Sequence, residues 1–224
     1  MRIGIVGGSG KQGSGLALRW KRAGHSVVIG SRDPARARAQ VAALPPDAPL
    51  RAAALEIGDY GWATAQSDVV VLTVPYEAHA ETLRAVAPHA AGKVVVDVTV
   101  PLRPPKVSRV ALPPGQAAAL EAQAALGTAA PVVAALHHVS WAHLTDLSHA
   151  IECDVLVASD DATAKATVLG LMRDLGARGL DAGALVNAIA LEALTPVLIH
   201  LNKVYKSDGA GIVFTDLPGA PSRV

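Results

Sequence analysis

Short runs of consecutive apolar residues recur along the chain, and longer alanine-rich segments separate them. Runs without a polar alternation are typical of parallel strands that are covered on both faces. The repeated order of strand and helix predicts an α/β fold with a doubly wound, mostly parallel sheet. The expected strands are 2–7, 26–30, 68–74, 93–98, 131–136 and 153–158, with a weaker one at 49–54. The expected helices are 11–23, 34–44, 76–87, 116–126 and 162–175.

The first apolar run ends in GGSGKQGSG, where Gly8, Gly10 and Gly13 form the pattern G-x-G-x-x-G. Directly after a strand and before a helix, this pattern favours a dinucleotide site. Gly8 is expected to permit the tight turn, Gly10 to let backbone N–H groups reach a pyrophosphate, and Gly13 to let the helix pack closely. Ser9 can donate its hydroxyl to a phosphate or to the turn itself. The fold class that follows is a Rossmann-type doubly wound sheet with a small C-terminal helical segment.

The second strand ends in Gly30, Ser31 and Arg32, where a site for NAD usually carries a carboxylate. The nearest acid, Asp33, precedes a proline and is expected to cap the next helix. Ser31 and Arg32 offer a hydroxyl and a planar cation, which suit the 2′-phosphate of NADP(H). Arg36, one turn into the helix, can reach the same phosphate or lie on a solvated face.

Two further strand ends carry candidate chemistry. Thr73, Val74, Pro75 and His79 lie at or just after the end of the third strong strand and are expected to line the nicotinamide side, although ordinary turn chemistry also explains the proline. The later run ALHHVSWAHL predicts a polar pocket rim, in which His137 either faces a substrate or is a structural histidine. Neither stretch shows a metal-ligand set or a second group able to relay a proton.

Composition narrows the classes of function. The formal charge of +1 and the aromatic content of 3% argue against nucleic-acid binding or a polybasic membrane face. A lone cysteine, Cys153, and an N-terminus that begins at once with a strand fit a reducing cytoplasm. The long apolar segment 184–202 contains Asn187, Glu192 and Pro196, so it predicts a buried helix rather than a membrane span.

The chain resembles the NADPH-dependent F420 reductases, also called F420-dependent NADP oxidoreductases, over nearly its whole length. The resemblance is carried by GGSGKQGSGLALR, GSRD, VVVLTVPYEAH, VVAALHHVSWAHL and CDVLVASDD, and above all by the last block, LDAGALVNAIALEALTPVLIHLNKVYKSDGAGI. It implies a cytoplasmic homodimer that transfers a hydride between NADP(H) and the deazaflavin coenzyme F420. The middle of DVTVPLRPPKVSRVALPPG departs from the family pattern and is expected to form a different lid.

The resemblance agrees with the site expected from the residues. A deazaflavin accepts a hydride on carbon, so no alkoxide forms and no general acid is required. Two alternatives stay open: an NADPH-dependent reductase of a flavin, a ferric chelate or an imine, and a non-catalytic NADP(H)-sensing module. We expect residues 1–182 to form the NADP-binding domain and 183–224 to serve dimerisation and pocket closure. The expected cofactor contacts are Gly8, Ser9, Gly10, Lys11, Gln12, Gly13, Ser31, Arg32, Arg36, Thr73, Val74, Pro75 and His79, and the expected substrate contacts are His137, Val139 and Ser140.

Overall fold

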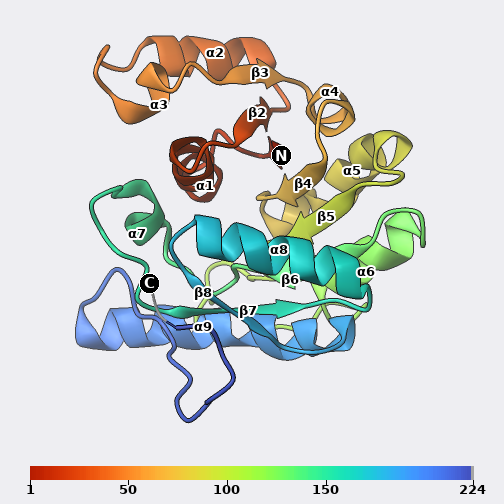
Figure 1. Cartoon of the computed structure of the whole chain (residues 1–224), viewed down its shortest axis with the longest axis vertical. Helices are drawn as coiled ribbons and strands as arrows, with labels where there is room; N and C mark the ends of the chain where they lie inside the picture. Colours follow the sequence, from red (N-terminus) through yellow and green to blue (C-terminus); the bar gives the residue numbers. More distant parts are fainter. Residues whose placement is uncertain (223–224) are drawn as a thin grey trace.

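The computed structural model describes residues 1–222 and contains an eight-stranded sheet in the order β3-β2-β1-β4-β5-β6-β7-β8 (Figure 1). All neighbouring strands are parallel except β6 and β7, which are antiparallel. The strands are β1 (Arg2–Val6), β2 (Ser26–Gly30), β3 (Glu56–Gly58), β4 (Val69–Leu72), β5 (Val94–Asp97), β6 (Val132–Ala135), β7 (Asp154–Ala158) and β8 (Arg178–Asp181). The predicted α/β class with a mostly parallel sheet is confirmed.

Helices cover both faces of the sheet. The α-helices are α1 (Lys11–Arg22), α2 (Pro34–Ala42), α3 (Pro49–Ala52), α4 (Tyr60–Ala65), α5 (Tyr76–Val86), α6 (Ala118–Leu126), α7 (Trp141–Thr145), α8 (Ala162–Asp174) and α9 (Ala188–Tyr205), with 3₁₀ turns η1 (Ala87–His89) and η2 (Leu185–Asn187). Side chains of α1, α7 and α8 belong to one buried cluster, and those of α5, α6 and α9 belong to another. The two clusters are the cores on the two faces of the sheet, as expected for strands that are apolar on both sides.

Several segments differ from the sequence-based expectation, since β3, α4, α7 and β8 were not expected and one expected strand is a helix. The weak strand expected at 49–54 is wrong, because Pro49 begins the short helix α3 instead. Pro is well suited to the first position of a helix, and this placement accounts for the difference. Strand β8 (Arg178–Asp181) was not predicted, since its sequence RGLD lacks a β-branched run.

The C-terminal helix is attached to the sheet domain by polar contacts as well as apolar ones. The buried Glu192 carboxylate accepts hydrogen bonds from the backbone N–H groups of Ala118 (2.8 Å) and Ala119 (3.0 Å), at the start of α6. Beyond α9, the backbone N–H of Asp154 in β7 donates to the carbonyl of Ile212 over 2.8 Å. Residues Leu185–Tyr205 are long and apolar enough to cross a membrane by length and composition alone, a property shared by core helices of soluble proteins.

Candidate active site

The glycine turn after β1 is built by close packing. Gly7 has a φ of +83°, so the left-handed position of the turn falls one residue before the expected Gly8. A Cβ on Gly8 would lie 2.6 Å from the Ile29 side chain and 2.8 Å from the Ile5 carbonyl. A Cβ on Gly13 would lie 2.5 Å from the Gly8 backbone, so the close contact between helix and turn requires glycine there.

Helix α1 begins at Lys11 without a hydrogen bond from a capping side chain, because Gly10 occupies the N-cap. The first N–H groups of a helix have no intrahelical partner, and an anion can accept their hydrogen bonds. These groups lie beside an elongated cavity of about 630 Å³ beyond the carboxyl ends of the central strands. That location is where open α/β sheets bind their ligands.

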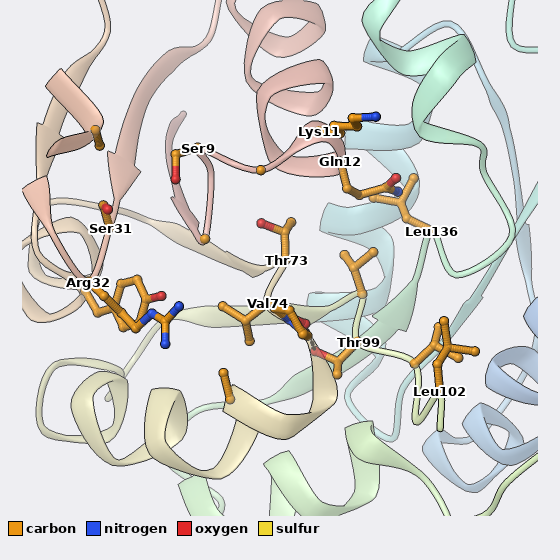
Figure 2. A pocket seen from close by; sticks show the side chains of 18 of the residues that line it. Ser9, Lys11, Gln12, Ser31, Arg32, Thr73, Val74, Thr99, Leu102 and Leu136 are labelled. Atoms are coloured by element: carbon orange, nitrogen blue, oxygen red, sulfur yellow. Dashed lines mark hydrogen bonds between the residues drawn. The ribbon is translucent and has the colours of Figure 1, made fainter. Parts of the chain in front are cut away.

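One end of the cavity lies beside β2 and carries the predicted phosphate-binding side chains. Figure 2 shows Arg32 at this end, and Ser31 and Arg36 also line it. Asp33 is engaged as expected, since its carboxylate accepts the Arg36 backbone N–H over 2.9 Å and caps α2. The Ser31 hydroxyl also has a local role, because it donates to the Asp33 carbonyl over 3.1 Å.

Tyr60, from the start of α4, lines the same end of the cavity and was not singled out from the sequence. Burial raises the pKa of its hydroxyl, and the neighbouring Arg32 cation acts in the opposite direction. The guanidinium of Arg32 therefore lies close to the Tyr60 hydroxyl at the cavity wall.

The middle of the cavity is walled by the ends of β4 and β5. Thr73, Val74 and Pro75 line it, and the Thr73 hydroxyl donates to the Val6 carbonyl over 2.9 Å. The structure places His79 away from the cavity: its side chain is 2% exposed and its Nε2 lies 2.7 Å from an Asp97 carboxylate oxygen. His79 lies on the inward face of α5. Its position in the sequence after a strand does not show this orientation, which depends on where it falls around the helix.

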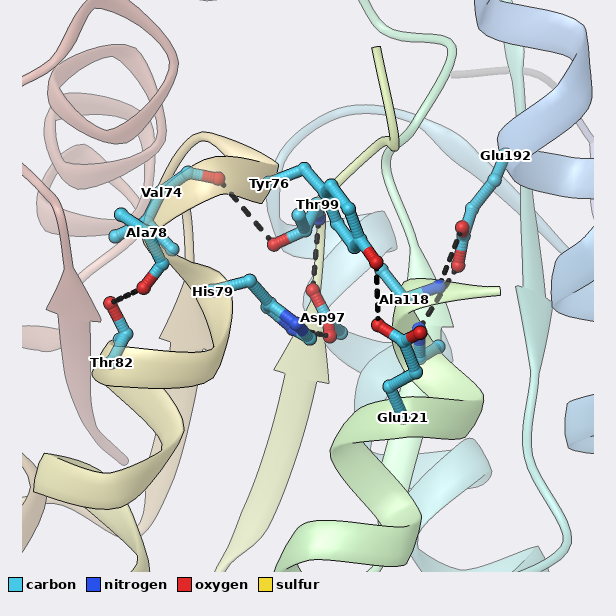
Figure 3. A network of polar contacts seen from close by, with 11 residues as sticks. Val74, Tyr76, Ala78, His79, Thr82, Asp97, Thr99, Ala118, Glu121 and Glu192 are labelled. Atoms are coloured by element: carbon cyan, nitrogen blue, oxygen red, sulfur yellow. Dashed lines mark hydrogen bonds and ion pairs between the residues drawn. The ribbon is translucent and has the colours of Figure 1, made fainter. Parts of the chain in front are cut away.

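The His79–Asp97 pair supports the cavity wall from behind (Figure 3). The other Asp97 oxygen accepts the Thr99 backbone N–H over 2.9 Å, and Thr99 lines the cavity. Burial disfavours both charged forms, but the hydrogen bond and the opposite charges outweigh it, so the pKa of His79 is raised and the pKa of Asp97 is lowered. We conclude that the pair is ionic and positions Thr99.

At the far end, the histidine run after β6 contributes one residue to the cavity. His137 lines it, is 5% exposed, and has no hydrogen-bond partner for either ring nitrogen within residues 1–222. Burial lowers the pKa of His137 to about 3, so its imidazole is neutral at physiological pH. The preceding Leu136 also lines the cavity and has a φ of +68°, a left-handed conformation that is uncommon for a residue other than glycine.

Val139 and Ser140 do not line the cavity in this chain. Val139 is buried, and its carbonyl accepts a 3.4 Å hydrogen bond from Gln12 Nε2. Ser140 caps α7 and its hydroxyl donates to the Asp208 carbonyl over 2.6 Å. Gly8 and Gly13 shape the turn below the cavity without lining it. The predicted site residues that the structure brings together around the cavity are Ser9, Gly10, Lys11, Gln12, Ser31, Arg32, Arg36, Thr73, Val74, Pro75 and His137.

Helix α9 completes the far end. Thr195 lines the cavity, and its hydroxyl donates to the His137 carbonyl over 2.7 Å. Glu192 lies one turn earlier and fixes the helix on α6, as described above. Burial is the main cause that raises the pKa of Glu192, to about 8. Within residues 1–222, no group of three or more His, Cys, Asp or Glu side chains is arranged to hold a metal ion.

A mostly parallel sheet with a glycine turn under a cavity at its carboxyl edge defines a dinucleotide-binding protein of the Rossmann type. The family model described as "NADP oxidoreductase coenzyme F420-dependent" matches residues 2–101. The "F420-dependent NADP reductase" of Methanocaldococcus jannaschii is 37% identical over 97% of this chain and 99% of its own length. The protein of the same name from Methanothermobacter thermautotrophicus is also 37% identical, over 97% and 96% of the two chains.

A solved structure extends the similarity to the fold. The putative F420-dependent NADP reductase of Arthrobacter sp. FB24 has a TM-score of 0.81 and 25% identity, covering 96% of this chain and 99% of its own. The chain therefore belongs to the F420-dependent NADP reductase family, which is a family of oxidoreductases.

Proposed function

We propose that this protein transfers a hydride between NADP(H) and the deazaflavin coenzyme F420. The observation that carries the proposal is one continuous cavity with two different ends. The end beside β2 offers Ser31 and Arg32 to a phosphate, and the far end offers Leu136 and Thr195. Among residues 1–222, no protonated acid lines that end, because His137 is neutral and Glu192 lies outside the lining. Such a cavity suits a nicotinamide and a second flat ring system that exchange a hydride without a general acid.

The reaction balances without a proton carrier from the protein. A hydride leaves the nicotinamide carbon with its electron pair, and a C–H bond forms on the deazaflavin carbon; NADPH is oxidised and the deazaflavin is reduced. The proton that completes the reduced ring system comes from solvent. The residues that line the cavity bind the two partners, orient their rings and exclude water.

The roles of the individual residues are part of this proposal. Ser9 and the N–H groups at the start of α1 bind the pyrophosphate, and Ser31, Arg32 and Arg36 bind the 2′-phosphate. Thr73, Val74 and Pro75 contact the nicotinamide side. His137 lies at the acceptor end as a neutral, shape-defining side chain.

The proposed assembly is a homodimer through α9. This helix buries Leu191 and Leu198 in the chain, while Val197 is 46% exposed and Val204 is 54% exposed. Together with Ala190 and Leu201, the two valines recur at helical spacing and form an apolar face. A second copy of this chain, presenting the same face, is the occupant that the proposal names. A cytoplasmic location fits the single cysteine.

The deciding experiment mixes the purified protein with NADPH and coenzyme F420 and follows the deazaflavin absorbance. Loss of the oxidised deazaflavin band with NADPH, and a much slower loss with NADH, is the expected result. A flavin, a ferric chelate and a cyclic imine serve as competing acceptors in parallel. Turnover with one of these and none with the deazaflavin would refute the proposal in favour of another reductase, and tight NADP(H) binding without any turnover would favour a sensing module.

A further inference from the structure

The loop between β5 and α6, residues 98–117, begins at the acceptor end of the cavity. Thr99, Val100 and Leu102 line the cavity, and Figure 2 shows Leu102 at its edge, far from Arg32. Later residues of the same loop, 110–112, line a small hollow together with Pro196 of α9. The loop is thus held at both ends, by the cavity wall and by the C-terminal helix.

Between these anchors the loop displays three cations, Arg103, Lys106 and Arg109, all exposed. Residues 98–120 contain no Asp or Glu. The N–H of Lys106 donates to the Arg103 carbonyl over 2.9 Å, and the N–H of Arg109 donates to the Lys106 carbonyl over 3.2 Å. Each such turn brings its first and fourth Cα atoms within about 7 Å, so the three cations form a compact row.

Among the residues that the structure describes, this row has no ion-pair partner. Within residues 1–222, no carboxylate lies at ion-pair distance from Arg103, Lys106 or Arg109. The phosphate-binding side chains for the dinucleotide, Ser31 and Arg32, lie at the other end of the cavity (Figure 2). The row is therefore not needed for the 2′-phosphate, and it begins directly after Leu102, which lines the acceptor end.

We propose that Arg103, Lys106 and Arg109 bind the anionic tail of the acceptor. The inference rests on the proposed function: coenzyme F420 carries a phosphate and glutamates beyond its ring system, and these groups must leave the cavity somewhere. Guanidinium and ammonium groups bind phosphate and carboxylate through charge-assisted hydrogen bonds. A row of three cations that begins next to Leu102, at the acceptor end, matches a chain of successive negative charges better than it matches a single phosphate.

The test compares two acceptors that share one ring system: coenzyme F420 and the deazaflavin chromophore that lacks the phosphate and glutamates. The variant carries Arg103→Glu, Lys106→Glu and Arg109→Glu. The control carries Lys21→Glu, Arg84→Glu and Arg173→Glu, which make the same change in net charge at exposed positions on α1, α5 and α8. The measured quantity is the ratio of kcat/KM for the tailed acceptor to kcat/KM for the tailless one, at low and high salt.

We expect the ratio to fall tenfold or more in the loop variant and to stay within about twofold in the control. In the wild type, added salt should weaken the use of the tailed acceptor and leave the tailless one nearly unaffected, because screening acts only on the charged tail. An unchanged ratio in the loop variant, or an equal fall in the control, would overturn the loop inference while the hydride transfer stands. If neither acceptor is reduced by the wild type, the proposed function fails, and fluorescence titration of both deazaflavins still decides whether the loop binds the tail.

Discussion

His79 Nε2 lies 2.7 Å from the Asp97 carboxylate, and the two side chains are 2% and 0% exposed. An ionic pair this deeply buried joins the start of α5 to the end of β5, and it holds Thr99 at the cavity. Water does not screen these buried charges. Removing one partner therefore lowers the free energy of unfolding by more than it would for a surface pair.

Replacing Asp97 by Asn should reduce the free energy of unfolding by about 3–5 kcal/mol near pH 6. The raised pKa of His79 means that its stabilising contribution is complete below its unfolded value, about 6.5, and is lost as the pH rises through the folded value. The difference between wild type and variant should therefore shrink from pH 6 to pH 9, as measured by urea unfolding. The control is Asp174→Asn, which breaks the more exposed pair with His25 and should cost about 0–1 kcal/mol. Equal losses in the two variants would contradict this account.

Glu192→Gln should make the free energy of unfolding depend less on pH. Its pKa, raised to about 8, means that the folded protein holds a proton that the unfolded chain releases near pH 4.3. Wild-type stability is then complete below that value and declines by a few kcal/mol as the pH rises to about 8. Thermal or urea unfolding between pH 5 and 9 should show a smaller decline in the variant. The exposed Glu77→Gln should keep the wild-type slope, and a variant that retains the full slope would disprove the assignment.

His137→Asn should lower the rate or the affinity for the acceptor only modestly. With a pKa of about 3, His137 is neutral throughout the working range and has no proton to deliver. The loss should stay below the 10²–10⁴-fold typical of a general acid or base. The kcat/KM profile from pH 5.5 to 8.5 gives an independent measurement. A wild-type dependence on a group near 6.5 that vanishes in the variant would identify His137 as a proton carrier after all.

Arg32→Ala should raise the KM for NADPH tenfold or more, because a charged hydrogen bond to a phosphate contributes on the order of 1.5–3 kcal/mol. The KM for NADH should change little, since NADH has no 2′-phosphate. Arg38→Ala is the matched control: Arg38 lies on α2, which begins two residues after Arg32, but its guanidinium donates to the Ile57 carbonyl. Equal affinity of the wild type for NADP(H) and NAD(H), measured by calorimetry, would be inconsistent with the proposed specificity.

Ala190→Glu should convert the proposed dimer into a folded monomer. Ala190 is exposed in the single chain, so a glutamate there is solvated in the monomer and becomes costly only when a second apolar face covers it. Sedimentation velocity at micromolar concentration should show the change, and circular dichroism should show an intact fold. Ala39→Glu, exposed on α2, should leave the assembly unchanged. A wild type that sediments as a monomer would rule the assembly out.

The sequence predicted those parts of the site that depend only on residues adjacent in the chain. The strand, the glycine turn and the Asp33 cap each depend on neighbouring residues, and Arg36 N–H donates to Asp33 as expected. Thr195 and Tyr60 could not be found in this way, because only the fold brings α9 and α4 to a cavity that begins at Gly7. His79 shows the converse error: its place after a strand suggested a cofactor contact, whereas the helix phase turns it toward Asp97.

The cavity joins Ser9, near the start of the chain, to Thr195, near its end. A ribosome therefore completes the dinucleotide half long before it adds α9. Until then the growing chain lacks both the wall that Thr195 supplies and the core residues Ala188 and Leu191, which are almost fully buried in the finished protein. The same helix therefore supplies the acceptor end of the cavity and part of the core on one face of the sheet, so a chain that stops before α9 lacks both.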